Sequence, residues 1–474
     1  MEKVLSFSFP QLSVEDEVIL RRAIRAQRAQ VLNNTLEKAK SPELYERLGE
    51  RRVQAVHTFL AEMILLSNQN PDLFWQITDH WATSFLLSRL YDQYGPTDPV
   101  QLNKLVSNLN GLLLFERLLN GTLESPATYI TYVDANGRIH GLLHDTSLEF
   151  KDEAFNGKEV EWVCSASEAS VRFADKDEPE FTIPLPLKAN QFVEFYPLAS
   201  SDMTGFPVLE ETVVWGRPKT LLEGTYENSD NTEEGWNPLS LKDSLAKAQT
   251  VIKNVWPEAY GWLETLIPAF VDMGVPPSRS MRFSSSYDPG SPIFMSRVDN
   301  HLAHAEDVLH EIQHHRLLLF ADTPHFKSWR DQRQIYASPY RQDPRPLRGL
   351  IIGIHAFLTV NELKKRVLEK QAGAEFLHRE MTETHYMNLF AFRTILEHEE
   401  FGDYGKQLFV QMGRALADHH TVIKSFATSE MGRVAEEKLL GHIAVVEQQS
   451  SEIQNTTPIY RNWDETARLA ATLN

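Results

Sequence analysis

Two histidines one helical turn apart form the segment of this chain that is best suited to chemistry. They are His310 and His314, and Glu311 directly follows the first, so the five residues spell His-Glu-x-x-His. Residues four positions apart lie on one face of a helix, so both imidazoles can bind one metal ion. Zinc and iron(II) both accept neutral imidazole, so the motif predicts a metal site without naming the metal.

The residues around the motif favour a packed helix. Apolar residues recur there at helical spacing, which is typical of a helix with one buried face. They are Leu302, Ala305, Val308, Leu309, Ile312 and Leu319. The alternative is a surface helix that is merely rich in histidine, because His301, His304 and His315 are close neighbours of the motif.

A third protein ligand is needed, and the extensions typical of zinc peptidases are missing. The stretch after His314 has no glycine and no histidine at the required spacing, and Glu362 is followed four residues later by Arg366, not aspartate. His355 stands alone on an apolar helical stretch and is the best candidate by position for the third ligand. The alternative for His355 is a packed core histidine.

An arginine-rich segment lies between the motif and His355. Residues 336–349 hold three arginines and three prolines, which predicts a stiff cationic loop. Guanidinium binds a carboxylate through two parallel hydrogen bonds. Arg345 is therefore the first candidate to anchor the distal carboxylate of a metal-chelating cosubstrate such as 2-oxoglutarate, followed by Arg348 and Arg341. The alternative is a structural ion pair with Asp343.

Three segments together resemble a known family. They are the His-Glu-x-x-His motif, the Tyr-Arg-x-Asp-Pro-Arg-Pro-Leu-Arg-Gly block that starts at Tyr340, and the Gly-x-His-Ala-Phe stretch that starts at Gly353. They are similar to the HExxH-domain proteins of pathways that make ribosomally synthesised, modified peptides (RiPPs). The resemblance covers roughly residues 280–370, about a fifth of the chain. It implies an iron(II)- and 2-oxoglutarate-dependent dioxygenase that uses molecular oxygen to hydroxylate the β-carbon of residues in a precursor peptide.

Two other functions stay open. If the metal is zinc, Glu311 becomes the general base that deprotonates a metal-bound water, and the protein is a metallopeptidase. In a hydroxylase Glu311 would instead orient a ligand or a water molecule from beside the metal. The third hypothesis is a non-catalytic peptide-binding partner protein with a vestigial metal site.

The charge of the chain limits its partners. There are 65 acidic and 47 basic residues, which give a formal net charge of −18. A surface this negative repels phosphate backbones and anionic lipids, which disfavours nucleic acid and membranes as partners. The start of the sequence lacks the basic and apolar regions of a secretory signal, and Cys164 is the sole cysteine. We therefore expect a cytoplasmic protein.

Periodicity along the chain predicts a predominantly helical α+β fold. Helical spacing dominates from about residue 13 to 120, with helices starting at Asn70 and near Pro99, and again from 302 to about 450. Between them lie short runs of β-branched and aromatic residues with turn signals, which predict antiparallel strands. These runs are near 129–133, 160–163, 171–173, 181–183 and 192–195, and another precedes the motif at 293–296.

These patterns predict two domains. The first, residues 1–225, is a helical N-terminal region with a β-rich insertion at about 127–220, and we expect it to include the surface that recruits the substrate. The second, residues 240–474, is a helical metal-binding catalytic domain. Residues 226–240 are polar and rich in turn formers, as in a linker.

Overall fold

The structure is a computed structural model of the chain, and not every residue is described. The described residues are 14–38, 41–91, 98–121, 123, 126–144, 146–173, 176, 178–188, 191–197, 208–210, 239–276, 284–285, 290–321, 334–370, 376–399, 401–454 and 463–473. Nearly all of the expected linker 226–240 lies outside them.

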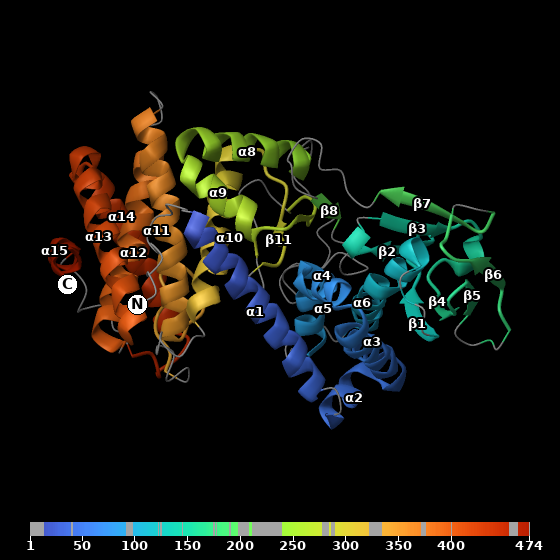
Figure 1. Cartoon of the computed structure of the whole chain (residues 1–474). Coiled ribbons are helices and arrows are strands. Elements are labelled where there is room, and N and C mark those ends of the chain that lie inside the picture. Colours follow the sequence, from blue (N-terminus) through green and yellow to red (C-terminus); the bar gives the residue numbers. More distant parts are fainter. Residues whose placement is uncertain are drawn as a thin grey trace. The chain divides into compact units, whose positions relative to one another are not determined.

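The predicted fold class is confirmed. The described part of the chain is 66% helical, with small sheets, so the protein is α+β and predominantly helical (Figure 1). It divides into two compact units. Unit 1 comprises Met1–Leu20, Ser244–Ile267 and Asn300–Asn474, and unit 2 comprises Arg21–Asp243 and Pro268–Asp299. Residues 268–299 thus lie in unit 2, whereas the sequence suggests that they continue the second domain.

The helices of unit 2 lie in its N-terminal half. They are α2 (Pro42–Leu48), α3 (Glu50–Gln69), α4 (Pro71–Asp79), α5 (Trp81–Tyr91) and α6 (Pro99–Asn120), together with the later part of α1 (Val14–Lys38). The predicted starts at Asn70 and near Pro99 are confirmed, and the side chains of Ser41, Asn70 and Asp98 accept hydrogen bonds from backbone N–H groups in the first turns. Proline follows each of the three caps.

One predicted helix is divided in the structure. The sequence predicts a single helix from Asn70 that carries Trp81, but α4 ends at Asp79, and Trp81 begins α5. His80 between them has an extended backbone (φ −72°, ψ 135°), which ends the helical hydrogen-bond ladder. The helical spacing of apolar residues continues across His80, so the sequence pattern does not reveal this break between α4 and α5.

The β strands of unit 2 form three small sheets. The first has the order β1-β4-β5-β6 and the second β2-β3-β7, and both are antiparallel. The five strands predicted between 129 and 195 are confirmed, while β2 and β3 were not anticipated. The bounds are β1 (Ala127–Tyr132), β2 (Arg138–Gly141), β3 (Thr146–Phe150), β4 (Glu159–Cys164), β5 (Glu168–Phe173), β6 (Phe181–Pro184) and β7 (Val193–Pro197).

The third sheet explains why residues 268–299 belong to unit 2. Its order is β10-β11-β9-β8, and β9 pairs in parallel with both β8 and β11. The expected antiparallel region at 127–220 is therefore parallel at its last strand. The strands are β8 (Val208–Glu210), β9 (Phe270–Asp272), β10 (Ser284–Ser285) and β11 (Ile293–Met295), the last as predicted.

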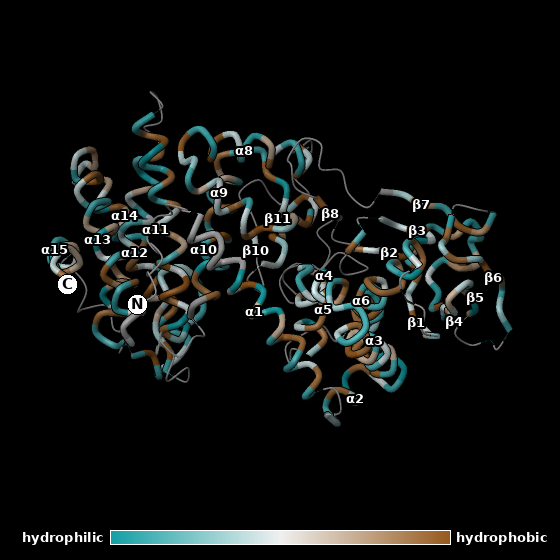
Figure 2. The backbone as a smooth tube through the Cα atoms, viewed as in Figure 1, coloured by the Kyte–Doolittle hydropathy of each residue, from teal (hydrophilic) through white to brown (hydrophobic). Residues whose placement is uncertain are grey.

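Unit 1 is built from helices. Brown and teal stretches alternate along them in Figure 2, as expected for helices with one buried and one exposed side. They are α8 (Leu241–Val255), α9 (Pro257–Leu266), α10 (His301–Ala321), α11 (Leu347–Lys370), α12 (Leu377–His398), α13 (Asp403–Phe426), α14 (Ser429–Glu447) and α15 (Trp463–Thr472). In the described part of the chain, no helix combines the length and apolarity that a bilayer crossing requires.

A buried polar cluster joins α6 to β2 and β3 in unit 2. His140 Nε2 lies 3.1 Å from Asp134 Oδ2, and His140 Nδ1 lies 2.8 Å from the Ser147 hydroxyl. Lys104 Nζ, on a fully buried side chain, is 3.8 Å from the same carboxylate. Burial and the charge of Lys104 outweigh the attraction of Asp134 and lower the pKa of His140 to about 4.

Because of this cluster, we expect the protein to become less stable as the pH is lowered. Unfolded histidine has a pKa near 6.5, so between about pH 6.5 and 4 the unfolded chain binds a proton that folded His140 does not. The free energy of unfolding should therefore drop as the pH falls through this window, by up to about 3 kcal/mol. Denaturant unfolding at several pH values should show a flatter dependence for His140→Asn than for the wild type, and parallel curves would contradict the assignment.

Candidate metal centre

The motif helix α10 is held on several sides. Four residues of the predicted apolar stripe, Ala305, Val308, Leu309 and Ile312, are at most 1% exposed, whereas its ends Leu302 and Leu319 are half-buried. A buried ion pair links it to the next helix, with Lys364 Nζ on α11 lying 3.5 Å from Glu306 Oε1 on α10. Because the helix is fixed by packing and by charge, the partly exposed side chains of His310 and His314 have a defined place.

The structure brings the three motif residues together. Among the residues that it describes, the group with metal-ligand spacing consists of His310, Glu311 and His314, whose ligand atoms all lie within 4.8 Å of one another. The two imidazole centroids are 4.5 Å apart at an interplanar angle of 83°. Both histidines are half-buried, while Glu311 is 2% exposed. The rings are therefore sheltered by the helix packing yet not sealed in the core.

The state of His314 suits a metal ligand. Burial lowers the pKa of His314, and the nearby carboxylate of Glu311 only partly opposes this, so the neutral imidazole is favoured. Its Nδ1 is buried and has no hydrogen-bond partner among the described residues. A buried polar atom without a partner is costly unless an external group satisfies it. Two imidazoles and a carboxylate are also a donor set that zinc and iron(II) accept, so the residues fit such an ion.

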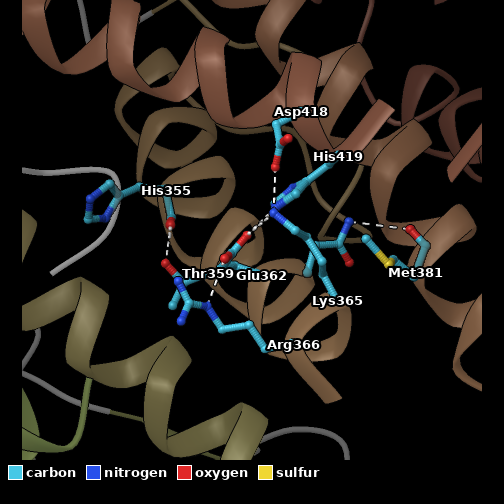
Figure 3. A network of polar contacts seen from close by, with 9 residues as sticks. His355, Thr359, Glu362, Lys365, Arg366, Met381, Asp418 and His419 are labelled. Atoms are coloured by element: carbon cyan, nitrogen blue, oxygen red, sulfur yellow. Dashed lines mark hydrogen bonds and ion pairs between the residues drawn. The ribbon is translucent and has the colours of Figure 1, made fainter. Parts of the chain in front are cut away.

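His355 does not join this group. It lies on α11, is 2% exposed, and its backbone carbonyl accepts a hydrogen bond from the Thr359 hydroxyl at 3.4 Å. Figure 3 shows its ring pointing away from the charged side chains of Glu362, Lys365 and Arg366, which lie about two and three turns further along α11. The third carboxylate or imidazole close to the two motif histidines is Glu311. The role of His355 as third ligand stays a prediction.

The arginine-rich loop is anchored to its surroundings. The backbone N–H and carbonyl of Tyr336 and Arg345 bond to each other at 2.7 and 2.8 Å, closing the segment into a hairpin-like turn. From α14, His442 Nε2 lies 3.0 Å from the carbonyl oxygens of both Ser338 and Arg341. Carbonyls can only accept, so this nitrogen carries the proton and donates to both.

The three arginines of the loop differ in their surroundings. Arg345 Nη2 pairs with Asp343 Oδ2 at 2.8 Å, and Arg341 Nε lies 3.8 Å from the other oxygen, so the ion pair considered as an alternative is present. Arg341 and Asp343 are largely exposed, whereas Arg345 is more enclosed and its Nε is buried without a hydrogen-bond partner among the described residues. Arg348 is half-buried at the start of α11.

Two aromatic rings connect this loop to the motif. Phe357 on α11 meets the ring of His310 edge to face, with centroids 4.8 Å apart, and stacks on Tyr340 at 4.7 Å and 9°. The Tyr340 hydroxyl donates to Asn388 Oδ1 on α12 at 2.8 Å. Gly353 makes room for this stack, since a Cβ there would lie 2.5 Å from the Tyr340 ring. Sequence reasoning identified the blocks that contain Tyr340 and Phe357 but assigned no role to either.

A second charged network lies further along α11 (Figure 3). Burial opposes ionisation of Glu362, but the hydrogen bond and charge of His419 and the neighbouring cations Lys365 and Arg366 lower its pKa to about 2. His419 Nε2 lies 3.1 Å and Arg366 Nε 2.8 Å from its carboxylate oxygens. Lys365 also reaches Asp418 on α13 at 2.6 Å. Glu362 thus joins α11 and α13 through its contact with His419.

Two comparisons with known proteins find no relative of this chain. No protein-family model matches the chain, and no curated protein matches it significantly. The family resemblance of residues 280–370 therefore remains a prediction, and the function must be argued from the site itself.

The geometry of α10 predicts which histidines bind metal. Replacing a direct ligand should cost more than the 10- to 100-fold loss typical of changes around a site, so His310→Ala and His314→Ala should each weaken iron(II) or zinc binding by at least about 100-fold. His301→Ala is the matched control, because His301 is an exposed histidine on the same helix. Anaerobic calorimetric titration measures this, and equal losses in all three variants would contradict the assignment.

Proposed function

We propose that the protein is an iron(II)- and 2-oxoglutarate-dependent oxygenase that hydroxylates the β-carbon of residues in a ribosomally synthesised precursor peptide. The observation that carries the proposal is the joint placement of two half-buried imidazoles and an arginine-bearing loop. His310 contacts Phe357, and Phe357 stacks on Tyr340, which belongs to the same loop as Arg345. A metal-chelating dicarboxylate needs both a metal and a guanidinium.

The residues would divide the work as follows. His310 and His314 would hold the ion, with His355 as the candidate third ligand, and Glu311 would orient a ligand or a water beside it. Iron(II), when bound with 2-oxoglutarate and dioxygen, would supply an oxidation that converts 2-oxoglutarate to succinate and carbon dioxide and a peptide C–H group to C–OH. Arg345 is the first candidate for the distal carboxylate, because its Nε is buried and lacks a partner among the described residues. Arg348 and Arg341 follow.

We also propose a peptide substrate and a cytoplasmic location. The net charge of −18 favours a neutral or cationic peptide over nucleic acid. Iron(II) must stay reduced, which fits a reducing compartment, and Cys164 is a buried free thiol whose pKa burial raises to about 12.

A zinc metallopeptidase is the second candidate, and one observation favours it. The buried Glu311 carboxylate lies within 4.8 Å of the ligand atoms of both motif histidines, which is close enough to accept a proton from a metal-bound water. The two functions use the same residues differently, so their products separate them.

Product analysis tests the proposed function. The protein is reconstituted anaerobically with iron(II), then incubated with 2-oxoglutarate, oxygen and a precursor peptide encoded beside its gene. Succinate release matched by a gain of one oxygen atom per event in the peptide mass is the expected result. Two shorter fragments without succinate would overturn the proposal in favour of the peptidase. Glu311→Gln should weaken a hydroxylase but abolish a peptidase.

The anchoring role of Arg345 has its own test. Arg345→Lys keeps the positive charge but loses the paired donors, so the 2-oxoglutarate concentration for half-maximal succinate release should rise about tenfold or more. Arg379→Lys is the control, since Arg379 is an exposed arginine of the same unit that pairs with Glu383. An unchanged 2-oxoglutarate requirement in Arg345→Lys would assign Arg345 to the ion pair with Asp343 alone.

A further inference from the structure

The ring of His310 has an aromatic neighbour that is itself fixed. Phe357 meets the imidazole at a centroid distance of 4.8 Å and an interplanar angle of 74°. An edge-to-face contact of this kind is the favoured geometry for two aromatic rings. Because Phe357 lies on α11 and His310 on α10, the contact restricts the rotation of the imidazole from a second helix.

Phe357 is in turn held on its other side. Tyr340 stacks on it at 4.7 Å and nearly parallel, at 9°, and the Tyr340 hydroxyl donates to the fully buried Asn388. Burial raises the pKa of Tyr340 well above its usual value, so the phenol keeps the proton that it donates. The ring of Tyr340 therefore cannot move away without breaking this partly buried hydrogen bond.

The backbone of α11 is shaped to admit this stack. At Gly353 a Cβ would lie 2.5 Å from Cδ2 and 2.8 Å from Cε2 of the Tyr340 ring, so no other residue fits without moving that ring. Gly353 lies four residues before Phe357, which places both on one face of the helix. The glycine therefore sets the distance between the loop and α11.

We propose that Phe357 and Tyr340 are positioning residues, which orient the His310 imidazole for metal binding and tie the arginine loop to the metal site. The assignment rests on the proposed function, since it presupposes that His310 is a ligand. Beyond that function, it couples the loop to the metal site: a displacement of Tyr340 would shift Phe357 and so change the orientation of the His310 ring toward the ion. The contacts run from His310 through Phe357 and Tyr340 to Asn388.

Cobalt(II) binding to the full-length protein is the test, because the absorption of cobalt reports ligand geometry as well as affinity. Phe357→Leu removes the ring but keeps an apolar side chain, and Gly353→Ala forces the Tyr340 ring to move. We expect both variants to bind cobalt about tenfold more weakly than the wild type, as changes beside a metal ligand do, and to shift its visible absorption bands.

A matched control separates positioning from loss of packing. Phe392 on α12 is fully buried and stacks on Phe409 at 4.4 Å and 7°, so Phe392→Leu removes a comparable ring pair from the same unit. It should keep the wild-type cobalt affinity and spectrum. Cobalt binding of Phe357→Leu that equals that of Phe392→Leu would overturn the positioning role alone. A wild-type protein that takes up neither cobalt nor iron would overturn the proposed function as well.

Discussion

The spacing of two imidazoles along a rigid helix is the constraint on which the rest of the account depends. One helical turn separates His310 from His314, and a side chain can serve as a metal ligand only if its ring is held where the ion will be. The helix α10 meets this condition, because its opposite face is buried and Lys364 joins it to α11 through Glu306. The two imidazoles are therefore held in place by a fixed helix, and both remain half-exposed to solvent.

The surroundings of the two imidazoles are set by the arginine-rich loop, α11 and α14, which contact one another outside α10. The loop that carries Arg345 is closed by a backbone bridge to Tyr336 and held from α14 by His442. Tyr340 connects the same loop to α11. A loop fixed at its backbone and at one aromatic side chain holds its guanidinium group in one place. Binding to such a loop costs less conformational entropy than binding to a freely moving loop. Within the loop, Arg345 pairs with Asp343, while its buried Nε has no hydrogen-bond partner among the described residues.

Much of this arrangement could be predicted from the sequence, because it is encoded locally. The His-x-x-x-His spacing, the apolar stripe of α10 and the caps at Ser41, Asn70 and Asp98 are short-range signals. Local signals do not reveal which residue of another segment will touch a given side chain. The Phe357 contact and the pairing of Glu362 with His419 therefore emerge only from the packing of helices.

Two features depend on contacts between segments that are distant in the sequence, which local patterns do not reveal. Residues 268–299 read as part of the C-terminal region, but the parallel pairing of β9 with β8 binds them to unit 2, and parallel partners are distant in sequence. A histidine on an apolar stretch, such as His355, is compatible both with a metal ligand and with a packed core residue, so its role as third ligand stays a prediction. The structure buries it on α11, outside the group that Glu311 forms with the two motif histidines.

The most direct test of the central claim is the location of a metal by anomalous diffraction from crystals grown anaerobically with iron(II) or zinc. The account predicts one strong peak at the absorption edge of the metal, with a ring nitrogen of His310 and one of His314 each at about 2 Å. A metal bound elsewhere, or fully loaded protein with either ring turned away from the ion, would contradict it.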